Sequence, residues 1–600
     1  MKRYSKLLII VVTCLAGCLI SCDDDGFLRE NPETSFTYLN AFTISSQVGD
    51  CLADLYYTHK QYVFNYNGDD APQLFGHDML ECRYAAGLSN NYSIMSNWHT
   101  NTVRSPWNTW YNIVAKANLT LYGAEQVTWA NENDKQQIIA QARFMRGYAY
   151  LNLGELWGGV PISDEFSETP RTDWVRASRK DTYLFAIADL EAAAAVLPEH
   201  QQPGRVGKGA AYHFLAEAYL ALAADQNGDA ASIDKAIASA DETLRRHQLM
   251  TERFGSRANP NSTGSFQEIP DYYPDGDVFF DLFQRGNLDY EEGNTESLWV
   301  EQSEFSFYQK YASSANSVVA LNIPRMYGPQ SSNLAWRGEY VEEGAGMGPF
   351  NGGGVVNDKY GVPGSFSAYT GGRSVGYNRP TNWAMYGIWE NCEGDIRNSP
   401  VNIRREFKVL DPNHSLYYVE GFVISPDNVR QYCTEGSIYD WHPVFTKTNP
   451  IDDWGYEGLE SGVDNRTYIF HDYYYVRAAE TYLLRAEAKL LKGDIAGAAA
   501  DINTVRSRAK APLITADQVT IDYILDERIR ELYAEERRWQ TLLRMGGNIP
   551  RDRIVRYGMH MVDYPENKSG EPWTDFLWPI PQSAIDSNID ALLEQNPGWR

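Results

Sequence analysis

Apolar and small residues recur at helical spacing toward both ends of the chain. In segment 137–157, Ala142, Met145, Ala149 and Leu153 fall on one face of a helix. The same kind of spacing predicts further helices at 107–121, 181–197, 208–224, 232–247, 475–491, 495–509 and 521–545. We therefore expect a mainly α protein.

The helices come in pairs. Segments 475–491 and 495–509 are separated by Gly493 and Asp494, and such a pair is about 34 residues long. Helix, short turn and helix at this period is typical of tetratricopeptide repeats. One pair cannot bury its apolar face alone, so several must stack. We expect the N-terminal and C-terminal pairs to form one tetratricopeptide-like (TPR-like) superhelix.

The middle third of the chain has a different character. Segment 262–462 holds 24 of the 47 glycines and lacks helical periodicity. Long irregular segments in a folded protein often carry function. We predict a helical part at 38–261, a loop-rich insertion on the ligand side at 262–465, and a C-terminal part at 466–600 that completes the helical scaffold.

The N-terminus predicts an exported lipoprotein. Positive residues precede an apolar run that is too short to span a membrane stably, which is typical of a signal peptide at 1–21. The run ends in a lipobox, Leu19-Ile20-Ser21-Cys22, which makes Cys22 the lipidation site. Leu15-Ala16-Gly17-Cys18 is an alternative, but cleavage there shortens the apolar run. Residues 22–37 are polar and predict a flexible tether.

The charge of the chain narrows the class of ligand. After removal of three basic residues with the signal peptide, 79 acidic and 50 basic residues remain, a net charge of about −29. Such a field repels nucleic acids and anionic lipid headgroups. We therefore expect no nucleic-acid partner, and a ligand that is neutral or cationic.

Four cysteines remain beyond Cys22, namely Cys51, Cys82, Cys392 and Cys433. They show no CxxC spacing and no clustering with histidine. Export permits disulfides, but sequence spacing does not determine pairing, so two disulfides and buried free thiols are both open.

No motif in the chain predicts catalysis. The sequence Gly372-Arg-Ser374-Val-Gly376 fits GxSxG, but a nucleophile elbow follows a buried strand and opens a helix, and neither flank fits. Asp225-x-Asn227-x-Asp229 begins like a calcium loop but has alanine at its sixth and twelfth positions, which favours a turn between helices. We expect no catalytic residue, no cofactor and no metal site.

Acidic residues in the last predicted helix have a structural explanation. Glu527, Glu531 and Glu535 are spaced i, i+4 and i+8 and are interleaved with arginines. Paired carboxylates can serve acid–base chemistry. This spacing instead favours a ladder of ion pairs along the helix.

Aromatic residues supply the remaining chemistry. They make up 13% of the chain, with 40 Tyr and 16 Trp. The C–H faces of a sugar ring stack on such rings, so a neutral glycan suits this composition. The polar segment 90–101, which contains Trp98 and Asn101 and precedes the helix at 107–121, predicts one part of a binding site.

Blocks along the whole chain resemble the SusD/RagB family of nutrient-binding lipoproteins of the starch-utilisation type. The blocks lie at 27–32, 142–148, 154–161, 189–198, 204–211, 477–488, 502–509, 527–532 and 579–598. The most specific are Arg477-Ala-Ala-Glu480 and the run from Ile502 to Ala509. One departure is Thr541-Leu542, where the family often has Asp-Leu.

The resemblance implies four TPR-like helix pairs with the irregular third folded against them. It implies an outer-membrane lipoprotein, exposed at the cell surface in keeping with the acidic triplet after Cys22. It also implies glycan binding without chemistry, and a SusC-like TonB-dependent transporter as the partner that receives the glycan. The alternative is a TPR-type envelope scaffold that binds proteins rather than glycans.

Ligand residues vary within the family, so the candidates follow from position. They are Asp78, Trp98 and Asn101 near the first loop, and Trp336, Tyr369, Arg373, Tyr377 and Trp383 in the insertion. The identity of the glycan does not follow from the sequence.

Overall fold

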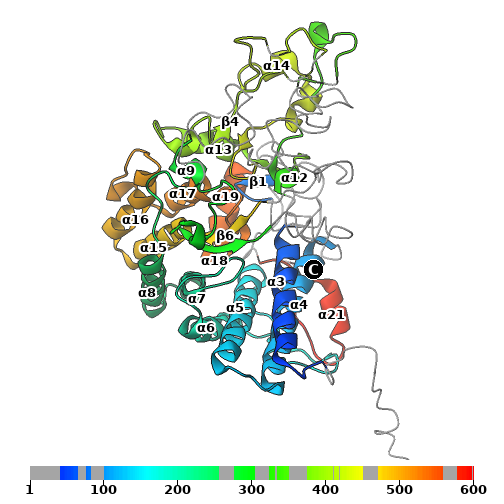
Figure 1. Cartoon of the computed structure of the whole chain (residues 1–600), viewed down its shortest axis with the longest axis vertical. Coiled ribbons are helices and arrows are strands. Elements are labelled where there is room, and N and C mark those ends of the chain that lie inside the picture. Colours follow the sequence, from blue (N-terminus) through cyan, green and yellow to red (C-terminus); the bar gives the residue numbers. More distant parts are fainter. Residues whose placement is uncertain are drawn as a thin grey trace, which may run out of the picture.

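The structure is a computed structural model of the whole chain (Figure 1). It describes residues 41–64, 76–82, 101–255, 276–303, 323–330, 334–346, 348–349, 374–409, 411, 413–417, 419–449, 471–558, 577–597 and 599.

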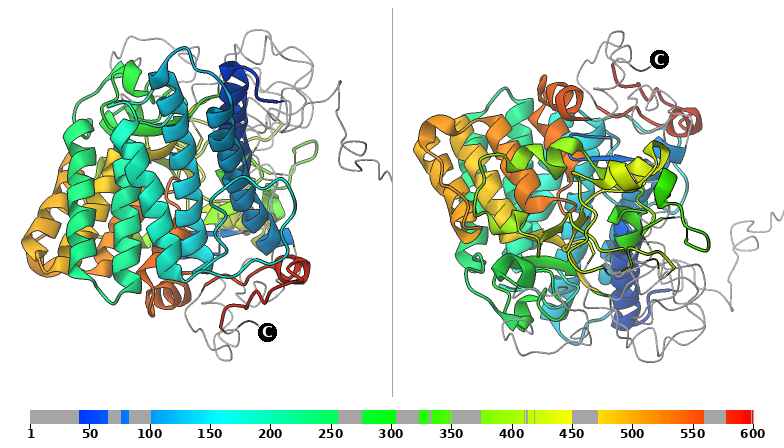
Figure 2. Two further views of the ribbon diagram at one scale, coloured as in Figure 1. Left: turned by 90° about the horizontal axis from the view of Figure 1, so that it is seen from below. Right: turned by 90° about the horizontal axis from the view of Figure 1, so that it is seen from above.

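Four consecutive helix pairs make up the scaffold within these described residues. They are α3 (Ser45–Phe64) with α4 (Asn101–Gln126), α5 (Glu132–Trp157) with α6 (Arg179–Val196), α7 (Lys208–Asp225) with α8 (Ala230–Arg246), and α15 (Ala478–Lys492) with α16 (Ile495–Arg508). Each helix packs against the next, and α8 packs against α15. The side-by-side arrangement is seen in Figure 2. The predicted single array of N-terminal and C-terminal pairs is confirmed.

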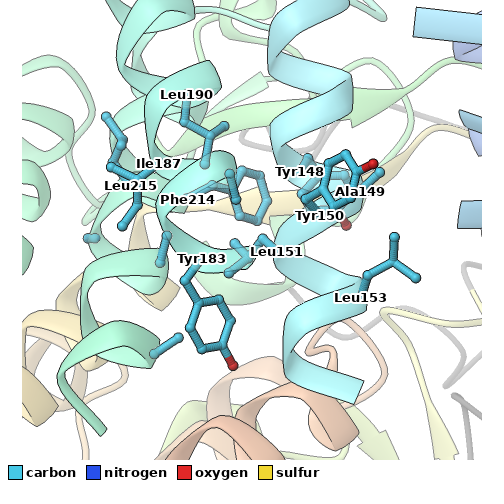
Figure 3. Packing of buried hydrophobic residues seen from close by; sticks show 14 of the residues in the cluster. Tyr148, Ala149, Tyr150, Leu151, Leu153, Tyr183, Ile187, Leu190, Phe214 and Leu215 are labelled. Atoms are coloured by element: carbon cyan, nitrogen blue, oxygen red, sulfur yellow. The ribbon is translucent and has the colours of Figure 1, made fainter. Parts of the chain in front are cut away.

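Helix α5 shows how the sequence sets this packing. The side chain of Asn131 caps its first turn by accepting from the backbone N–H of Asn133 at 3.0 Å. A Cβ at Gly147 would lie 2.9 Å from the carbonyl oxygen of Ala186, so glycine lets α6 approach closely. Tyr148 on α5 and Phe214 on α7 meet at a ring-centroid distance of 4.6 Å (Figure 3). The small residues therefore set the helix spacing, and the aromatic rings fill the core.

Two predicted boundaries in the C-terminal part are wrong. Residues Tyr473–Arg477 form strand β6, which pairs antiparallel with β2 (Ser297–Glu301), and the helix starts only at Ala478. Segment 521–545 is two helices, α17 (Ile521–Leu532) and α18 (Arg538–Met545), because Ala534 adopts a left-handed conformation with φ 62°.

The remaining elements are short. They are β1 (Leu80–Cys82), α9 (Val278–Asp281), η5 (Tyr290–Glu292), α12 (Ile323–Tyr327), η7 (Gly338–Tyr340), β3 (Asn378–Pro380), α13 (Asn382–Met385), η8 (Gly387–Trp389), η9 (Ile396–Asn398), β4 (Ile403–Arg404), α14 (Val429–Tyr432), η10 (Glu435–Asp440), β5 (Val444–Phe445), η12 (Ala516–Gln518), α19 (Ile549–Tyr557) and α21 (Gln582–Ser587). The expected lack of long helices in the insertion is confirmed for its described residues.

Part of the insertion stands away from the scaffold, around α14 (Figure 1). It has a hydrophobic cluster of its own, which includes Trp336, Phe407, Cys433 and Trp441. Cys51, Cys392 and Cys433 are free thiols, and the side chain of Cys82 is outside the described part. Among the described helices, none is long and apolar enough to cross a membrane.

Candidate ligand-binding site

A two-stranded ladder joins the bases of the two loop regions that the sequence singled out. Strands β1 and β3 pair antiparallel, with Leu80 opposite Pro380 and Cys82 opposite Asn378. After Cys82 the chain enters segment 83–100, which leads to α4, and segment 351–373 leads toward β3. Both loop regions are therefore attached to one small sheet.

Side-chain bonds reinforce this ladder. Nη1 of Arg379 donates to Oε1 of Glu81 at 2.9 Å, although the two residues are 298 positions apart. Oγ1 of Thr381 donates to the carbonyl oxygen of Asp78 at 2.8 Å and also caps α13. One of these contacts therefore lies within the ladder, between the paired residues Glu81 and Arg379, and the other extends it beyond Leu80 and Pro380.

Asp78 lies beneath the ladder and is fully buried. Nε and Nη2 of Arg538 donate to its two carboxylate oxygens at 2.7 and 2.6 Å, and Nε of Arg553 donates to Oδ2 at 2.8 Å. Burial alone would raise the pKa of this carboxyl, but the two guanidinium groups outweigh burial and hold the pKa well below its ordinary value. Asp78 therefore anchors β1 to α18 and α19, and this placement argues against direct contact with a ligand.

Trp383 lies beside the ladder in an aromatic stack. Its ring stacks on Tyr557 of α19 with centroids 4.4 Å apart and planes 23° apart, and both residues are half-buried. Nε1 of Trp383 donates to Asp526 at 3.0 Å, and the guanidinium of Arg553 lies 4.4 Å from the Tyr557 ring centroid. These partners hold the rings in place. The sequence analysis missed Tyr557, because no local pattern in the sequence links it to Trp383.

Tyr377 shares this location with Trp383. Both pack against the same hydrophobic cluster, which contains Met79, Leu80 and Ala384. The structure therefore brings two of the five candidates in the insertion together at the β1–β3 ladder.

Trp336 lies elsewhere, in the separate cluster near α14. It is buried, and its ring stacks on His414 with centroids 3.8 Å apart. A buried ring of this kind packs a core rather than offering a face to a sugar. The expectation that Trp336 contacts ligand is not supported by this placement.

The other predicted residues cannot be placed. Cys22, Trp98, Tyr369 and Arg373 lie outside the described residues. Asn101 directly follows segment 83–100 and is the first residue of α4, but its side chain is not among those that the structure describes.

The GxSxG segment does not have the geometry of a nucleophile elbow. Ser374 is followed by the short strand β3, and no helix begins there. The possible calcium loop is the turn between α7 and α8, where the carboxylate of Asp229 caps α8 by accepting from the backbone N–H of Ser232 at 2.8 Å. Asp229 therefore has a structural role as a helix cap.

The acidic ladder near α17 is a buried ion-pair network. Glu531 pairs with Arg397, Arg477 and Arg508, and it has no exposed side-chain surface. Burial would raise the pKa of Glu531, but these arginines lower it well below its ordinary value. The predicted ladder along one helix is confirmed only for Glu527, which pairs with Arg530 within α17. The partners of Glu531 come from three other segments of the chain, and Glu535 lies beyond the end of α17.

Two family models match the chain. Residues 422–599 match the model described as the SusD family, and residues 27–220 match the model described as "Starch-binding associating with outer membrane". These two ranges contain the blocks on which the resemblance in the sequence analysis rests. They leave most of the loop-rich insertion unmatched.

Curated relatives carry similar descriptions. The chain is 26% identical to a SusD-like protein of Bacteroides ovatus over 37% of this chain, and the match spans 40% of that protein. It is 21% identical to SusD-like protein P38 of Formosa agariphila over 96% of this chain and 100% of that protein.

Solved structures share the fold. A laminarin-binding SusD-like protein superposes with a TM-score of 0.60 at 18% identity, covering 93% of this chain and 100% of that one. Surface glycan-binding protein A from Bacteroides uniformis superposes with a TM-score of 0.60 at 19% identity, covering 92% and 100%. At these identities, the likeness shows the fold alone.

Proposed function

Because this chain belongs to the SusD/RagB family, we propose that it binds a neutral glycan at the outer membrane and delivers it to a SusC-like TonB-dependent transporter. The observation that carries the binding part is the half-buried stack of Trp383 on Tyr557 beside the β1–β3 ladder. Aromatic faces held in fixed positions are the surfaces on which sugar rings stack. Segments 83–100 and 351–373, which adjoin the same ladder in sequence, would supply Trp98, Tyr369 and Arg373. The first residue of α4 would supply Asn101.

The charge of the protein supports a neutral ligand. The formal net charge is −26, so an anionic polysaccharide would be repelled at long range. Stacking on two or three rings at roughly 1 kcal/mol each, together with hydroxyl hydrogen bonds, predicts a dissociation constant of about micromolar to millimolar. Weak binding suits a protein that must release its ligand to a transporter.

In this proposal, the lipobox at the N-terminus determines where in the cell the protein is located. Lipid on Cys22 anchors the protein to the outer membrane, and the tether at 22–37 allows movement relative to the transporter. Fifteen extended residues reach roughly 50 Å. This length would let the protein act as a lid on a barrel without releasing its anchor.

Affinity gel electrophoresis tests the glycan proposal. Gels contain one of laminarin, soluble starch, xylan, mannan, pectic galactan or chondroitin sulfate. We expect at least one of the five neutral polysaccharides to retard the protein and chondroitin sulfate not to. A Trp98→Ala variant should be retarded less than the wild-type protein while remaining folded. Unchanged mobility of this variant would remove loop 83–100 from the site.

A second function has one observation in its favour. The contact between α8 and α15 makes the helical array continuous in space despite the insertion, and continuous repeat arrays commonly bind proteins. An envelope scaffold would capture protein partners from membranes in the absence of glycan. Affinity purification separates the two functions, because the first predicts one dominant transporter partner and the second predicts several proteins.

A further inference from the structure

A large groove runs along helix α4 on the flank of the molecule that carries α21. It has a volume of about 900 Å³ and lies between α4, the connection from α5 to α6, and the C-terminal segment 583–593. Ligand sites typically have volumes of about 300–1,000 Å³. In Figure 1, α21 and α13 lie on different sides of the molecule, so this groove is separate from the Trp383 stack.

Aromatic side chains line the groove. Trp107 and Tyr111 come from α4, and Phe166 and Trp174 come from the connection. Trp174 is half-buried, and the guanidinium of Arg171 lies over its ring at 4.1 Å from the centroid. Trp107 is buried, so the rings that the groove offers are those of Tyr111, Phe166 and Trp174, each half-buried.

Most of the polar groups in the groove are uncharged. They include the side chains of Asn108, Ser167, Thr169, Ser583 and Ser587. Hydroxyl and amide groups exchange hydrogen bonds with sugar hydroxyls as both donors and acceptors. A groove for an acyl chain or an apolar helix would be lined mainly by aliphatic residues. Rings together with neutral polar groups therefore favour a carbohydrate.

The walls are fixed before any ligand binds. The Asn588 side chain accepts from the backbone N–H of Trp174 at 2.8 Å and donates to the carbonyl oxygen of the same residue at 2.8 Å. The hydroxyl of Tyr111 donates to the carbonyl oxygen of Pro161 at 2.7 Å. A wall that is already ordered loses little conformational entropy on binding, which favours affinity.

We propose that this groove is a second glycan-binding site, which takes a neutral oligosaccharide chain. The proposal rests on the proposed function and adds a site to it. Two sites on one protein can engage one polysaccharide together, so the second binding event becomes intramolecular and strengthens the first. The protein would then hold long chains more tightly than short ones of the same sugar.

The competing occupant is a protein. Val175, Ile589 and Leu592 belong to segments that border the groove, and each has more than 70% of its surface exposed. Exposed aliphatic groups of this kind can mark a protein interface. They do not line the groove itself, where aromatic and polar residues outnumber aliphatic ones such as Val114, Leu119 and Leu593, so the groove favours the glycan.

Titration calorimetry of the full-length protein in detergent tests the proposal. The probe is a six-sugar oligosaccharide cut from whichever of laminarin, starch, xylan, mannan or galactan binds the wild-type protein. We expect two oligosaccharides per wild-type protein and one per Trp174→Ala variant. Affinity for the parent polysaccharide should fall at least about tenfold in the variant.

A Ser583→Trp variant, which fills the groove from an exposed position, should behave in the same way. Trp129→Ala, a half-buried tryptophan outside the groove, is the matched control.

Hydrogen–deuterium exchange gives a readout that needs no variant. The same oligosaccharide should slow exchange in peptides that cover 161–176 and 583–593.

One oligosaccharide per wild-type protein, or no protection in these peptides, would overturn the second site while leaving the first intact. Absence of any glycan binding by the wild-type protein would overturn both. Loss of transporter co-purification in both groove variants, with two oligosaccharides still bound, would make the groove a protein interface and overturn the proposal.

Discussion

Arg538 donates two hydrogen bonds to the carboxylate of Asp78 across 460 positions of sequence. Both side chains have no exposed surface, and Arg553 makes a further bond to the same carboxylate. The pair joins strand β1, where the first loop region starts, to the C-terminal helices. The position of the candidate site therefore depends on contact between the two ends of the chain.

Asp78→Asn should destabilise the protein, because it removes the buried carboxylate that Arg538 and Arg553 share. The two guanidinium groups then keep Glu536 and Asp526 as their closest remaining anionic partners. Breaking a buried ion pair typically costs about 3–5 kcal/mol. Urea unfolding followed by circular dichroism should show a clearly lower midpoint. The exposed pair of Arg430 with Glu435 is the control, because Glu435→Gln should cost less than about 1 kcal/mol. Equal midpoints for the two variants would show that the Asp78 pairs do not support the fold.

Trp383→Ala should weaken glycan binding about fivefold to tenfold, since it removes one ring of the stack beside the ladder. Affinity is measured by titration with the polysaccharide that binds the wild-type protein. Trp129→Ala is the matched control, because Trp129 is also half-buried but lies beyond the other end of α4. The account of the site fails if the two variants bind equally well.

Acid should destabilise the protein in part through His59. This residue is buried against Trp299, and burial, with a smaller contribution from Arg537, lowers its pKa from 6.5 to about 3. Below about pH 6.5 the unfolded chain binds a proton at this position and the folded protein does not, so stability falls as the pH drops toward 3. The slope from one such group approaches about 1.4 kcal/mol per pH unit.

His59→Phe keeps a ring in that core position and removes the titrating group. Plots of unfolding free energy against pH between 4 and 7 should therefore be less steep for this variant than for the wild-type protein. Parallel plots would contradict the assignment of this slope to His59.

Cys22→Ala should release the protein from the membrane fraction, because it removes the proposed lipidated thiol. Cys18→Ala should leave the protein membrane-bound. Fractionation of cells followed by mass spectrometry of the mature N-terminus checks both variants. The reverse result would place the anchor at Cys18.

The helical scaffold could be predicted because its signal is local. In α5, the residues Ala142, Met145, Ala149 and Leu153 recur at helical spacing, and this spacing determines which face packs. The helix predicted at 475–491 includes the last three residues of strand β6, because a short run of this kind fits either structure when its partner β2 is unknown.

The candidate site was only partly predictable. Trp336 and Trp383 both lie in the glycine-rich insertion, and nothing local distinguishes the buried ring from the half-buried one. Burial depends on contacts distant in sequence, such as Trp383 with Asp526 and Tyr557. The role of Asp78 likewise depends on Arg538, which no sequence spacing connects to it.

Isothermal titration calorimetry of the wild-type protein against the five neutral polysaccharides tests the central claim most directly. The account predicts saturable binding of at least one of them, with a dissociation constant of about micromolar to millimolar, and none of chondroitin sulfate. Circular dichroism on the same sample shows that the protein is folded. Absence of heat with all five, from protein that is folded, would contradict the account.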